Sequence, residues 1–194
     1  MNKIAIIIPS RLDAQRLPNK PLKLINNKEM ILHVYDQAIK SKVGEVYVAT
    51  PDEKIFDTVK KAGGHVIKTS DNHQTGTDRI FEVFKEKLNS EPDIVINLQG
   101  DMPNIQPQAI SDLVSYMKEN KCDIGTLASE FNSKTEINNP NVVKVAVKEK
   151  LLSKMFLNVL DFFRIDGNST YNLYHHIGIY AFTNKALIRY VSLK

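Results

Sequence analysis

The stretch IAIIIPSRLDAQRLPNKPL, residues 4–22, decides the fold and raises the first question about function. Its apolar run at residues 4–8 is typical of a central strand that is covered on both faces. The loop after Pro9 contains no glycine but concentrates three cations, Arg11, Arg16 and Lys20. Such a loop would bind phosphate through side chains, because it lacks the G-x-x-x-x-G-K pattern of a backbone phosphate loop. The alternative is that all three are solvated loop cations.

The composition is that of an ordinary globular protein, with 194 residues and a net charge of +4. The basic residues are not crowded on one element, so we expect no nucleic-acid partner. The single cysteine, Cys122, excludes an internal disulfide and favours a reducing compartment, and we expect it to be a small core residue. No apolar segment is long enough to cross a bilayer, and Pro9 interrupts the short run that resembles a signal peptide. We therefore expect a cytoplasmic protein without membrane insertion.

Strand-like and helix-like patterns alternate over the first two thirds of the chain. After the first run, strands are expected at EVYVAT (45–50), HVIK (65–68) and DIVINLQG (93–100). Apolar residues at helical spacing form four groups: Met30, Ile31, Val34, Ala38 and Ile39; Ile55, Phe56 and Val59; Ile80, Val83, Phe84 and Leu88; and Ile110, Leu113, Val114 and Met117. This alternation predicts a doubly wound α/β fold, a mostly parallel sheet with helices on both faces.

The second of these helices has recognisable start and end signals. Thr50 is placed to cap its first turn, and Glu53 follows at the spacing of a capping box. Gly63 and Gly64 are expected to end it, because glycine favours the left-handed backbone found after helices.

Beyond residue 120 the pattern becomes strand-rich, with DIGTLAS (123–129), VVKVAV (142–147) and HIGIYAF (176–182). The final NKALIRYVSLK (184–194) predicts a helix. We interpret residues 1–194 as a single α/β domain in which residues 120–182 form a smaller strand-rich portion.

Ligands of open parallel sheets bind beyond the carboxyl ends of the strands. Three segments should meet there: the loop after residue 8, the loop 69–79, and QGDMP (99–103). Asp101 in the last segment is a candidate Mg²⁺ ligand because this ion prefers hard oxygen ligands, although a lone aspartate at a strand end is more often a turn or cap residue. Gln99 could bind a polar ligand or close a turn.

Five segments occur in the order and spacing of one family: IPSRLDAQRLPNKPL (8–22), HQTGTDR (73–79), INLQGDMP (96–103), NPNVVKV (139–145) and HIGIYAF (176–182). From residue 4 to about residue 190 the chain resembles the 3-deoxy-manno-octulosonate cytidylyltransferases. That family couples CTP to the acidic sugar 3-deoxy-manno-octulosonate (KDO) and releases pyrophosphate, for lipopolysaccharide biosynthesis. The resemblance implies the same reaction here, a sheet of the nucleotide-diphospho-sugar transferase type, Mg²⁺ as cofactor, CTP and KDO as substrates, and a homodimer whose contact and sugar site involve the strand-rich portion.

The resemblance also implies a role for individual residues. It assigns nucleotide binding to Arg11, Arg16, Lys20, Thr75, Gly76, Thr77 and Arg79; sugar binding to Gln99, Arg164, His176 and Tyr180; metal binding to Asp101; and catalysis to Arg11, Lys20 and Asp101. From the pattern alone, His176 and Tyr180 would be strand residues with a core or dimer role. Asn19 stands where the family often has glycine, and asparagine tolerates the left-handed backbone that such a turn requires.

Departures from the family pattern keep other functions open. Met102 stands at a position that is acidic in the family, the segment after Arg164 is short, and the family continues beyond the length of this chain with a second metal-binding aspartate. One alternative is a truncated, inactive paralogue that folds and binds nucleotide. The other is a cytidylyltransferase for a different acidic sugar, such as a sialic acid.

Overall fold

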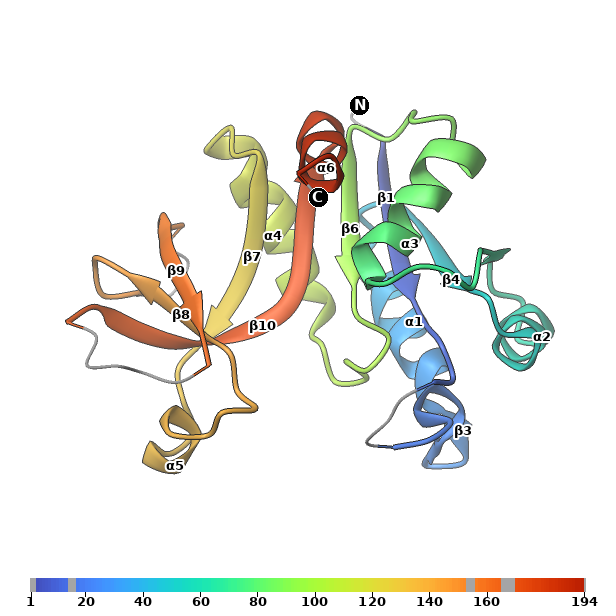
Figure 1. Cartoon of the computed structure of the whole chain (residues 1–194), viewed down its shortest axis with the longest axis horizontal. Coiled ribbons are helices and arrows are strands. Elements are labelled where there is room, and N and C mark those ends of the chain that lie inside the picture. The colour runs from blue at the N-terminus through green and yellow to red at the C-terminus, as the bar shows by residue number, and fades with distance from the viewer. Residues whose placement is uncertain (1–2, 14–16, 153–155, 165–169, 194) are drawn as a thin grey trace. The chain divides into compact units, whose positions relative to one another are not determined.

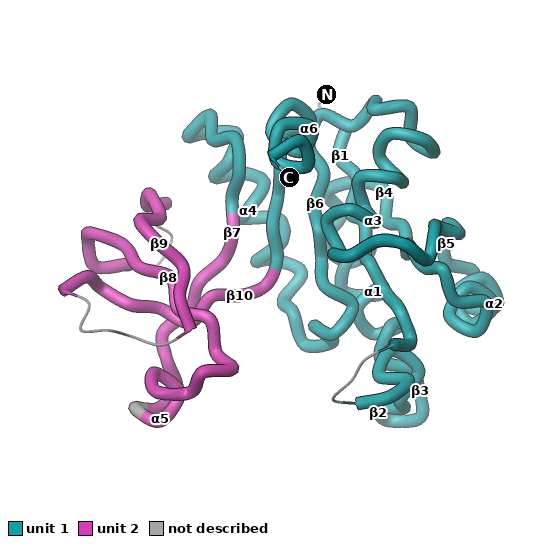
Figure 2. Tube along the Cα trace, viewed as in Figure 1, with its two compact units in different colours: residues 1–125, 179–194 teal, residues 126–178 magenta. Residues whose placement is uncertain are grey.

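The computed structural model describes residues 3–13, 17–152, 156–164 and 170–193. The chain divides into two compact units (Figure 2): unit 1 comprises Met1–Gly125 and Ile179–Lys194, and unit 2 comprises Thr126–Gly178. Two strands, at 124–129 and 172–183, contain residues of both units. The sequence prediction was one domain with a strand-rich portion at 120–182, and unit 2 lies within that portion.

The sheet of unit 1 is built around the strand that opens the sequence (Figure 1). Strand β1 (Ile4–Pro9) pairs in parallel with both β4 (Glu45–Thr50) and β6 (Ile94–Leu98). The short β5 (Val66–Lys68) continues the parallel order beyond β4. On the other side, the last residues of β10 (Asn172–Thr183) pair antiparallel with β6. The predicted mostly parallel sheet is confirmed, with an antiparallel neighbour that periodicity did not predict.

Helices cover both faces of this sheet, as the doubly wound prediction requires. In Figure 1, α3 (Gly76–Glu82) and α6 (Asn184–Val191) lie on one face, and α1 (Met30–Lys40) and α4 (Pro107–Glu119) lie on the other. Helix α2 (Glu53–Lys61) packs against β4 and β5. Helix α3 continues as a π-helical stretch, η2 (Val83–Lys87).

The core of unit 1 follows from the apolar run of β1, every residue of which is buried. On the face covered by α3 and α6, Ile7 and Val95 of the sheet join Phe84 and Leu187 in one apolar cluster. The predicted stripe of α4 is confirmed, because Ile110, Leu113, Val114 and Met117 are all buried. The predicted stripe of α1 is too wide by one residue, because Ile39 is 49% exposed.

Two local predictions were wrong in detail. Helix α2 is preceded by Asp52 and not by Thr50, which is buried at the end of β4 and accepts a hydrogen bond from the Asp52 N–H at 3.1 Å. The strand continued through the residue expected to cap the helix. Cys122 is half-buried and not a core residue, and its thiol donates to the Ile124 carbonyl at 2.8 Å. By contrast, Gly63 follows the helix with φ 78°, as expected.

Unit 2 is a small antiparallel structure. Strand β8 (Lys144–Val147) pairs with the first residues of β10 on one side and with β9 (Val159–Phe163) on the other, while β7 (Ile124–Ser129) also pairs with β10. A short helix, α5 (Lys134–Ile137), lies between β7 and β8 in the sequence. The sequence analysis missed β9, whose residues do not alternate between polar and apolar.

The first loop contains short elements that were not predicted. A 3₁₀ turn, η1 (Lys20–Leu22), is followed by a two-stranded hairpin of β2 (Leu24–Ile25) and β3 (Lys28–Glu29). Asn19 before the turn has φ 57°, so the expectation that it would take the left-handed backbone of a glycine is confirmed.

Candidate active site

A pocket of about 220 Å³ opens at the carboxyl end of β1 in unit 1. Its lining comes from the three segments that the sequence predicted to meet: Pro9, Ser10 and Arg11; His73, Gln74, Thr75, Gly76 and Arg79; and Gln99. The parallel register of β1, β4 and β6 brings these strand ends to the same edge of the sheet. Arg11, Thr75, Gly76, Arg79 and Gln99 of the predicted site residues therefore lie around one cavity.

The loop that enters α3 is fixed at Thr75. The Thr75 hydroxyl accepts from the Asp78 N–H at 3.2 Å, and the Asp78 carboxylate accepts from the Thr75 N–H at 3.1 Å. This reciprocal capping box explains why the helix starts here. Gly76 lies against Pro9, whose Cγ would be only 3.1 Å from an added Cβ. The close approach expected at this glycine is thus made to the end of β1.

Two guanidinium groups line the same pocket. Arg79 is only 3% exposed, and one of its terminal nitrogens donates to the Thr69 hydroxyl at 2.5 Å and to the Ser70 carbonyl at 2.8 Å. Burial, followed by the charge of Arg11, lowers the pKa of Arg79. An anionic ligand placed between Arg11 and Arg79 would relieve this repulsion, which fits the arginine geometry suited to phosphate.

Lys20 and Asp101 form an ion pair outside the lining of this pocket. The Lys20 ammonium lies 2.6 Å from the Asp101 carboxylate, and the two side chains are 35% and 50% exposed. The structure therefore joins a predicted phosphate-binding cation to the predicted metal ligand. Arg16, the third cation of the loop, lies outside the described residues.

A chain of side-chain amides runs beneath the pocket. Gln99 donates to the side-chain oxygen of Asn97 at 3.1 Å, and Asn97 donates to the Thr77 hydroxyl at 3.3 Å. Asn97 is 1% exposed in the middle of the buried strand β6. The sequence analysis missed it, although a single polar residue in an apolar strand was the available signal. Ser10, another missed residue, has a buried hydroxyl without a hydrogen-bond partner among the described residues.

The fit of Mg²⁺ to these residues can be tested from the donor set. Among the described residues, no three histidine, cysteine, aspartate or glutamate side chains come together. Asp101 by itself offers one carboxylate, which fits the habit of Mg²⁺ to take one or two carboxylates and complete its shell with water and phosphate oxygens. The residues present therefore fit Mg²⁺ bound together with a polyphosphate.

Two of the predicted sugar-binding residues, Arg164 and His176, belong to unit 2. The His176 ring is hydrogen-bonded to the Thr126 hydroxyl at 2.9 Å and meets the Phe162 ring edge-on at 5.0 Å between centroids. Burial, with a smaller contribution from His175, lowers the pKa of His176 to about 4. His176 is therefore neutral near pH 7. Arg164 is exposed at the end of β9, with weak contacts of 3.4 Å to the carbonyls of Pro140 and Asn141.

Tyr180, another predicted sugar-binding residue, belongs to unit 1, as Gln99 does. It packs against the apolar cluster between the sheet and α3, and its ring stacks on Phe182 at 6.1 Å. Burial raises the pKa of Tyr180. The side chain is half-buried in these surroundings.

Lys144 in unit 2 was not singled out by the sequence analysis as a functional residue. It has no exposed surface, and its ammonium donates to the carbonyls of Asn139 at 2.6 Å, Val142 at 2.9 Å and Arg164 at 2.6 Å. These bonds tie the turn before β8 to the end of β9.

Comparison with known proteins agrees with this fold. A solved structure titled as CMP:2-keto-3-deoxy-manno-octonic acid synthetase complexed with CTP superposes with a TM-score of 0.86 and 36% identity, over 99% of this chain and 78% of that one. A cytidylyltransferase from Leptospira borgpetersenii, at 20% identity and a TM-score of 0.65, shares the fold. The chain is thus a nucleotidyltransferase.

The sequence comparisons are more specific. The 3-deoxy-manno-octulosonate cytidylyltransferase of Brucella ovis is 42% identical over 195 residues, 98% of this chain and 76% of that protein. The protein of the same name in Brucella anthropi is 41% identical and matches to a similar extent. Residues 5–194 match the cytidylyltransferase family, and the chain belongs to that family.

Proposed function

We propose that this protein transfers CMP from CTP to KDO, giving CMP-KDO and pyrophosphate, as a step in lipopolysaccharide biosynthesis. The observation that carries the proposal is the pocket where Arg11 and the buried Arg79 converge, in a chain 36% identical to a structure solved with CTP. The relatives that are 42% identical are named for the same reaction, which supports KDO as the sugar.

The chemistry requires little from the protein beyond placement and charge. The anomeric hydroxyl of KDO attacks the α-phosphorus of CTP in line and gives up its proton to water, while pyrophosphate leaves with the electrons of the broken P–O bond. Arg11 and Lys20 hold the triphosphate and stabilise the charge that develops on the leaving group. Thr75, Gly76 and Arg79 shape the nucleotide pocket, and Arg16 belongs to the same loop.

Asp101 would hold Mg²⁺ together with the phosphates of CTP. When it is bound, the ion would neutralise part of the phosphate charge. Because Asp101 is paired with Lys20, it can accept the ion only if this pair opens or is shared. The pair is half-exposed, so opening it costs little.

The sugar side is assigned to Gln99, Arg164, His176 and Tyr180. Arg164 is the residue suited to the KDO carboxylate, because its guanidinium is exposed and makes only weak contacts. His176 has a lowered pKa of about 4, so it acts as a neutral hydrogen-bonding group towards sugar hydroxyls and not as a cation.

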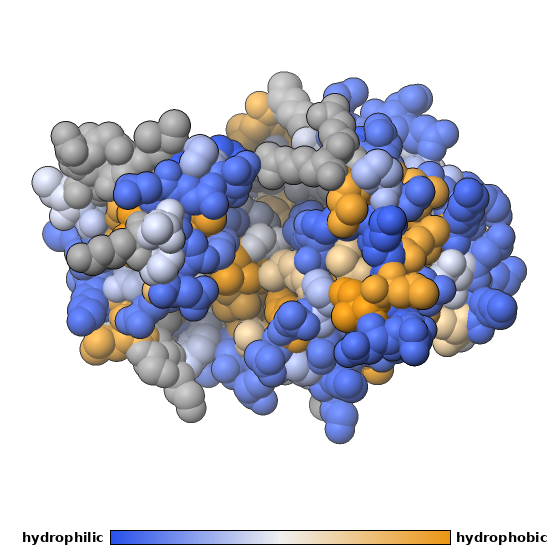
Figure 3. All heavy atoms as spheres, turned by 90° about the horizontal axis from the view of Figure 1, so that it is seen from below, coloured by the Kyte–Doolittle hydropathy of each residue, from blue (hydrophilic) through white to orange (hydrophobic). Residues whose placement is uncertain are grey.

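A homodimer is part of the proposal and is supported by the surface of β9. Leu160 and Phe162 of this strand are 48% and 40% exposed, and no strand other than β8 pairs with it among the described residues. Exposed apolar residues on such a strand favour association. On the face that Figure 3 draws, apolar patches interrupt a mostly hydrophilic surface. None of the described helices combines the length and hydropathy needed to cross a bilayer, and a cytoplasmic location is proposed.

Pyrophosphate release with CTP, KDO and Mg²⁺ tests the reaction directly. Release that depends on all three supports it, whereas nucleotide binding without release identifies an inactive paralogue. Faster release with a sialic acid than with KDO would assign a different sugar. Asp101→Asn should abolish the Mg²⁺-dependent turnover while CTP still binds, and retained turnover would place the metal elsewhere.

A further inference from the structure

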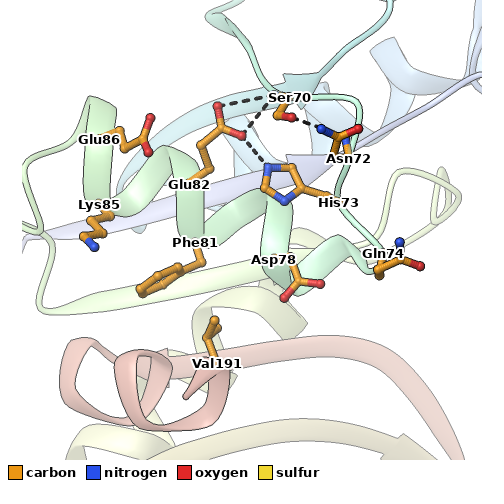
Figure 4. Close-up of a pocket in the computed structure, with 10 residues that line it drawn as sticks. All are labelled: Ser70, Asn72, His73, Gln74, Asp78, Phe81, Glu82, Lys85, Glu86 and Val191. Atoms are coloured by element: carbon orange, nitrogen blue, oxygen red, sulfur yellow. Dashed lines mark hydrogen bonds and ion pairs between the residues drawn. The ribbon is translucent and has the colours of Figure 1, made fainter. Parts of the chain in front are cut away.

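A second pocket lies on the other side of the loop that lines the nucleotide pocket. It has a volume of about 510 Å³ and is lined by Ser70, Asn72, His73, Gln74, Asp78, Phe81, Glu82, Lys85, Glu86 and Val191 (Figure 4). His73 and Gln74 line both pockets. The segment 70–76 is therefore a thin wall between them, and whatever holds this wall sets the shape of the nucleotide pocket.

Glu82 holds the wall from the side of the second pocket. Both oxygens of its carboxylate accept from the Ser70 N–H, at 3.0 and 3.4 Å, and one of them also pairs with the His73 ring (Figure 4). The Glu82 and His73 side chains are only 14% and 20% exposed. Burial by itself would raise the pKa of Glu82, but the hydrogen bonds from His73 and Ser70 outweigh it, and the pKa lies below its ordinary value. The carboxylate is thus charged and fully engaged.

Arg79 holds the same segment through the other backbone polar group of Ser70. It donates to the Ser70 carbonyl, while Glu82 accepts from the Ser70 N–H. Arg79 and Glu82 are three residues apart on α3, a spacing that places both side chains on one side of a helix. Side chains of helix α3 therefore bind both backbone polar groups of Ser70. Glu82 also binds His73, in the middle of the wall.

We propose that Glu82 is a positioning residue for the nucleotide. It lines the second pocket and not the nucleotide pocket, and it acts through Ser70 and His73 on the residues that do line the nucleotide pocket. The inference rests on the proposed function, since it assumes that CTP occupies the 220 Å³ pocket. A loop held in its binding shape before the ligand arrives does not have to be ordered on binding, which strengthens affinity without a new contact.

The neighbouring acid Glu86 provides a matched control. It is exposed and lines the same second pocket, and its side chain makes no hydrogen bond or ion pair within the described part of the chain. Replacing Glu86 by glutamine removes one negative charge from the same pocket and leaves the hydrogen bonds of the wall in place.

The test compares CTP binding by calorimetry for the full chain and for Glu82→Gln, Glu82→Ala and Glu86→Gln. We expect CTP to bind about tenfold more weakly to Glu82→Ala, a few-fold more weakly to Glu82→Gln, and unchanged to Glu86→Gln. In steady-state assays the KM for CTP should rise by the same factors, while kcat and the KM for KDO change less than about twofold. A residue that only stabilises the fold would lower Tm without this selective change.

The outcomes separate the inference from the proposed function. If the unaltered chain does not bind CTP, the proposed function fails. If it binds CTP and both Glu82 variants bind it equally well, the positioning role is overturned, whatever happens to Tm. If Glu82→Ala does not fold, Glu82→Gln decides the question, because glutamine retains the size of the side chain and an acceptor for Ser70.

Discussion

Arg79 and Lys144 are two buried cations in different units of the molecule. They differ in how many of their side-chain N–H groups are used in hydrogen bonds within the protein. Arg79 is 3% exposed and Lys144 is fully buried. Neither has a carboxylate within ion-pair distance among the described residues, and both donate to main-chain carbonyls instead. Burial of the charge therefore does not distinguish them.

The difference lies in unused donors. An ammonium has three N–H groups, and Lys144 spends all three on the carbonyls of Asn139, Val142 and Arg164. A guanidinium has five, and the two side-chain bonds of Arg79 come from one nitrogen. Arg79 also lines a pocket beside Arg11, whereas Lys144 ties two backbone segments together. Spare donors next to a cavity suit Arg79 to the binding role proposed for it, whereas Lys144 has no N–H group left for a ligand.

The substitution Arg79→Met is the strongest test of whether Arg79 binds a ligand and Lys144 does not. We expect CTP binding to weaken about 100-fold, or ~2.8 kcal/mol, because the buried cation facing the phosphate pocket is lost. Calorimetric titration with CTP measures the effect. Arg189→Met removes an exposed arginine from α6 and serves as the control. Undiminished CTP affinity in Arg79→Met would mean that Arg79 is as purely structural as Lys144.

Lys144→Met should give the opposite result. It leaves three carbonyls without their donor, so the unit formed by residues 126–178 should lose about 2 kcal/mol of local stability. Hydrogen exchange of the β8 amides reports this loss, and Lys148→Met, at an exposed position, is the control. CTP affinity should not change. A large loss of CTP affinity with normal β8 protection would contradict the assignment.

The pH dependence of His176 extends the comparison to a half-buried titratable group in unit 2. Its folded-state pKa of about 4 lies below the ordinary value of 6.5, so protonation favours the unfolded chain. The stability that this group contributes is present above about pH 6.5 and is lost as the pH falls through about 4. NMR titration of the ring should show neutral imidazole down to about pH 5.

The matching variant for this titration is His176→Gln, whose stability should decline less over the same pH range. Ring protonation of the folded protein near pH 6.5 would show that His176 is not desolvated, and would make it available as a cation for the sugar carboxylate.

The smallest effect on stability is expected for Lys20→Met. Its ion pair with Asp101 is 35% and 50% exposed, and such pairs contribute less than about 1 kcal/mol. Thermal unfolding should therefore be nearly unchanged, while the KM for CTP should rise because the proposed function assigns Lys20 to the triphosphate. A drop in Tm comparable to that of Lys144→Met would show that Lys20, too, is structural.

Much of the fold could be predicted because its signals are local. The apolar run of β1, the stripe of α4 and the left-handed Asn19 each depend on neighbouring residues, and each was confirmed. The predictions that went wrong, at Thr50 and Cys122, depended on where a strand ended and on what packed against it. Strand β9 was missed for a different reason, since its polarity pattern carries no period.

The candidate site divides in the same way. The cations of the first loop and the family motifs could be found by spacing, and Arg11, Thr75, Gly76, Arg79 and Gln99 do surround one pocket. The pairing of Lys20 with Asp101 could not be predicted, because the two residues are 81 positions apart in the chain. The hold of Glu82 on Ser70 was equally invisible, since a glutamate on a helix is usually a solvated residue.

The sequence by itself determined the alternation of strands and helices, the cationic loop after β1 and the cytidylyltransferase family, because side-chain periodicity and motif order are properties of neighbouring residues. Only the tertiary structure decided which charges are buried, which donors face a pocket, and which helix is hydrogen-bonded to the segment 70–76. Those properties depend on desolvation and hydrogen bonds between groups that are distant in the chain, and they exist only once the chain has folded.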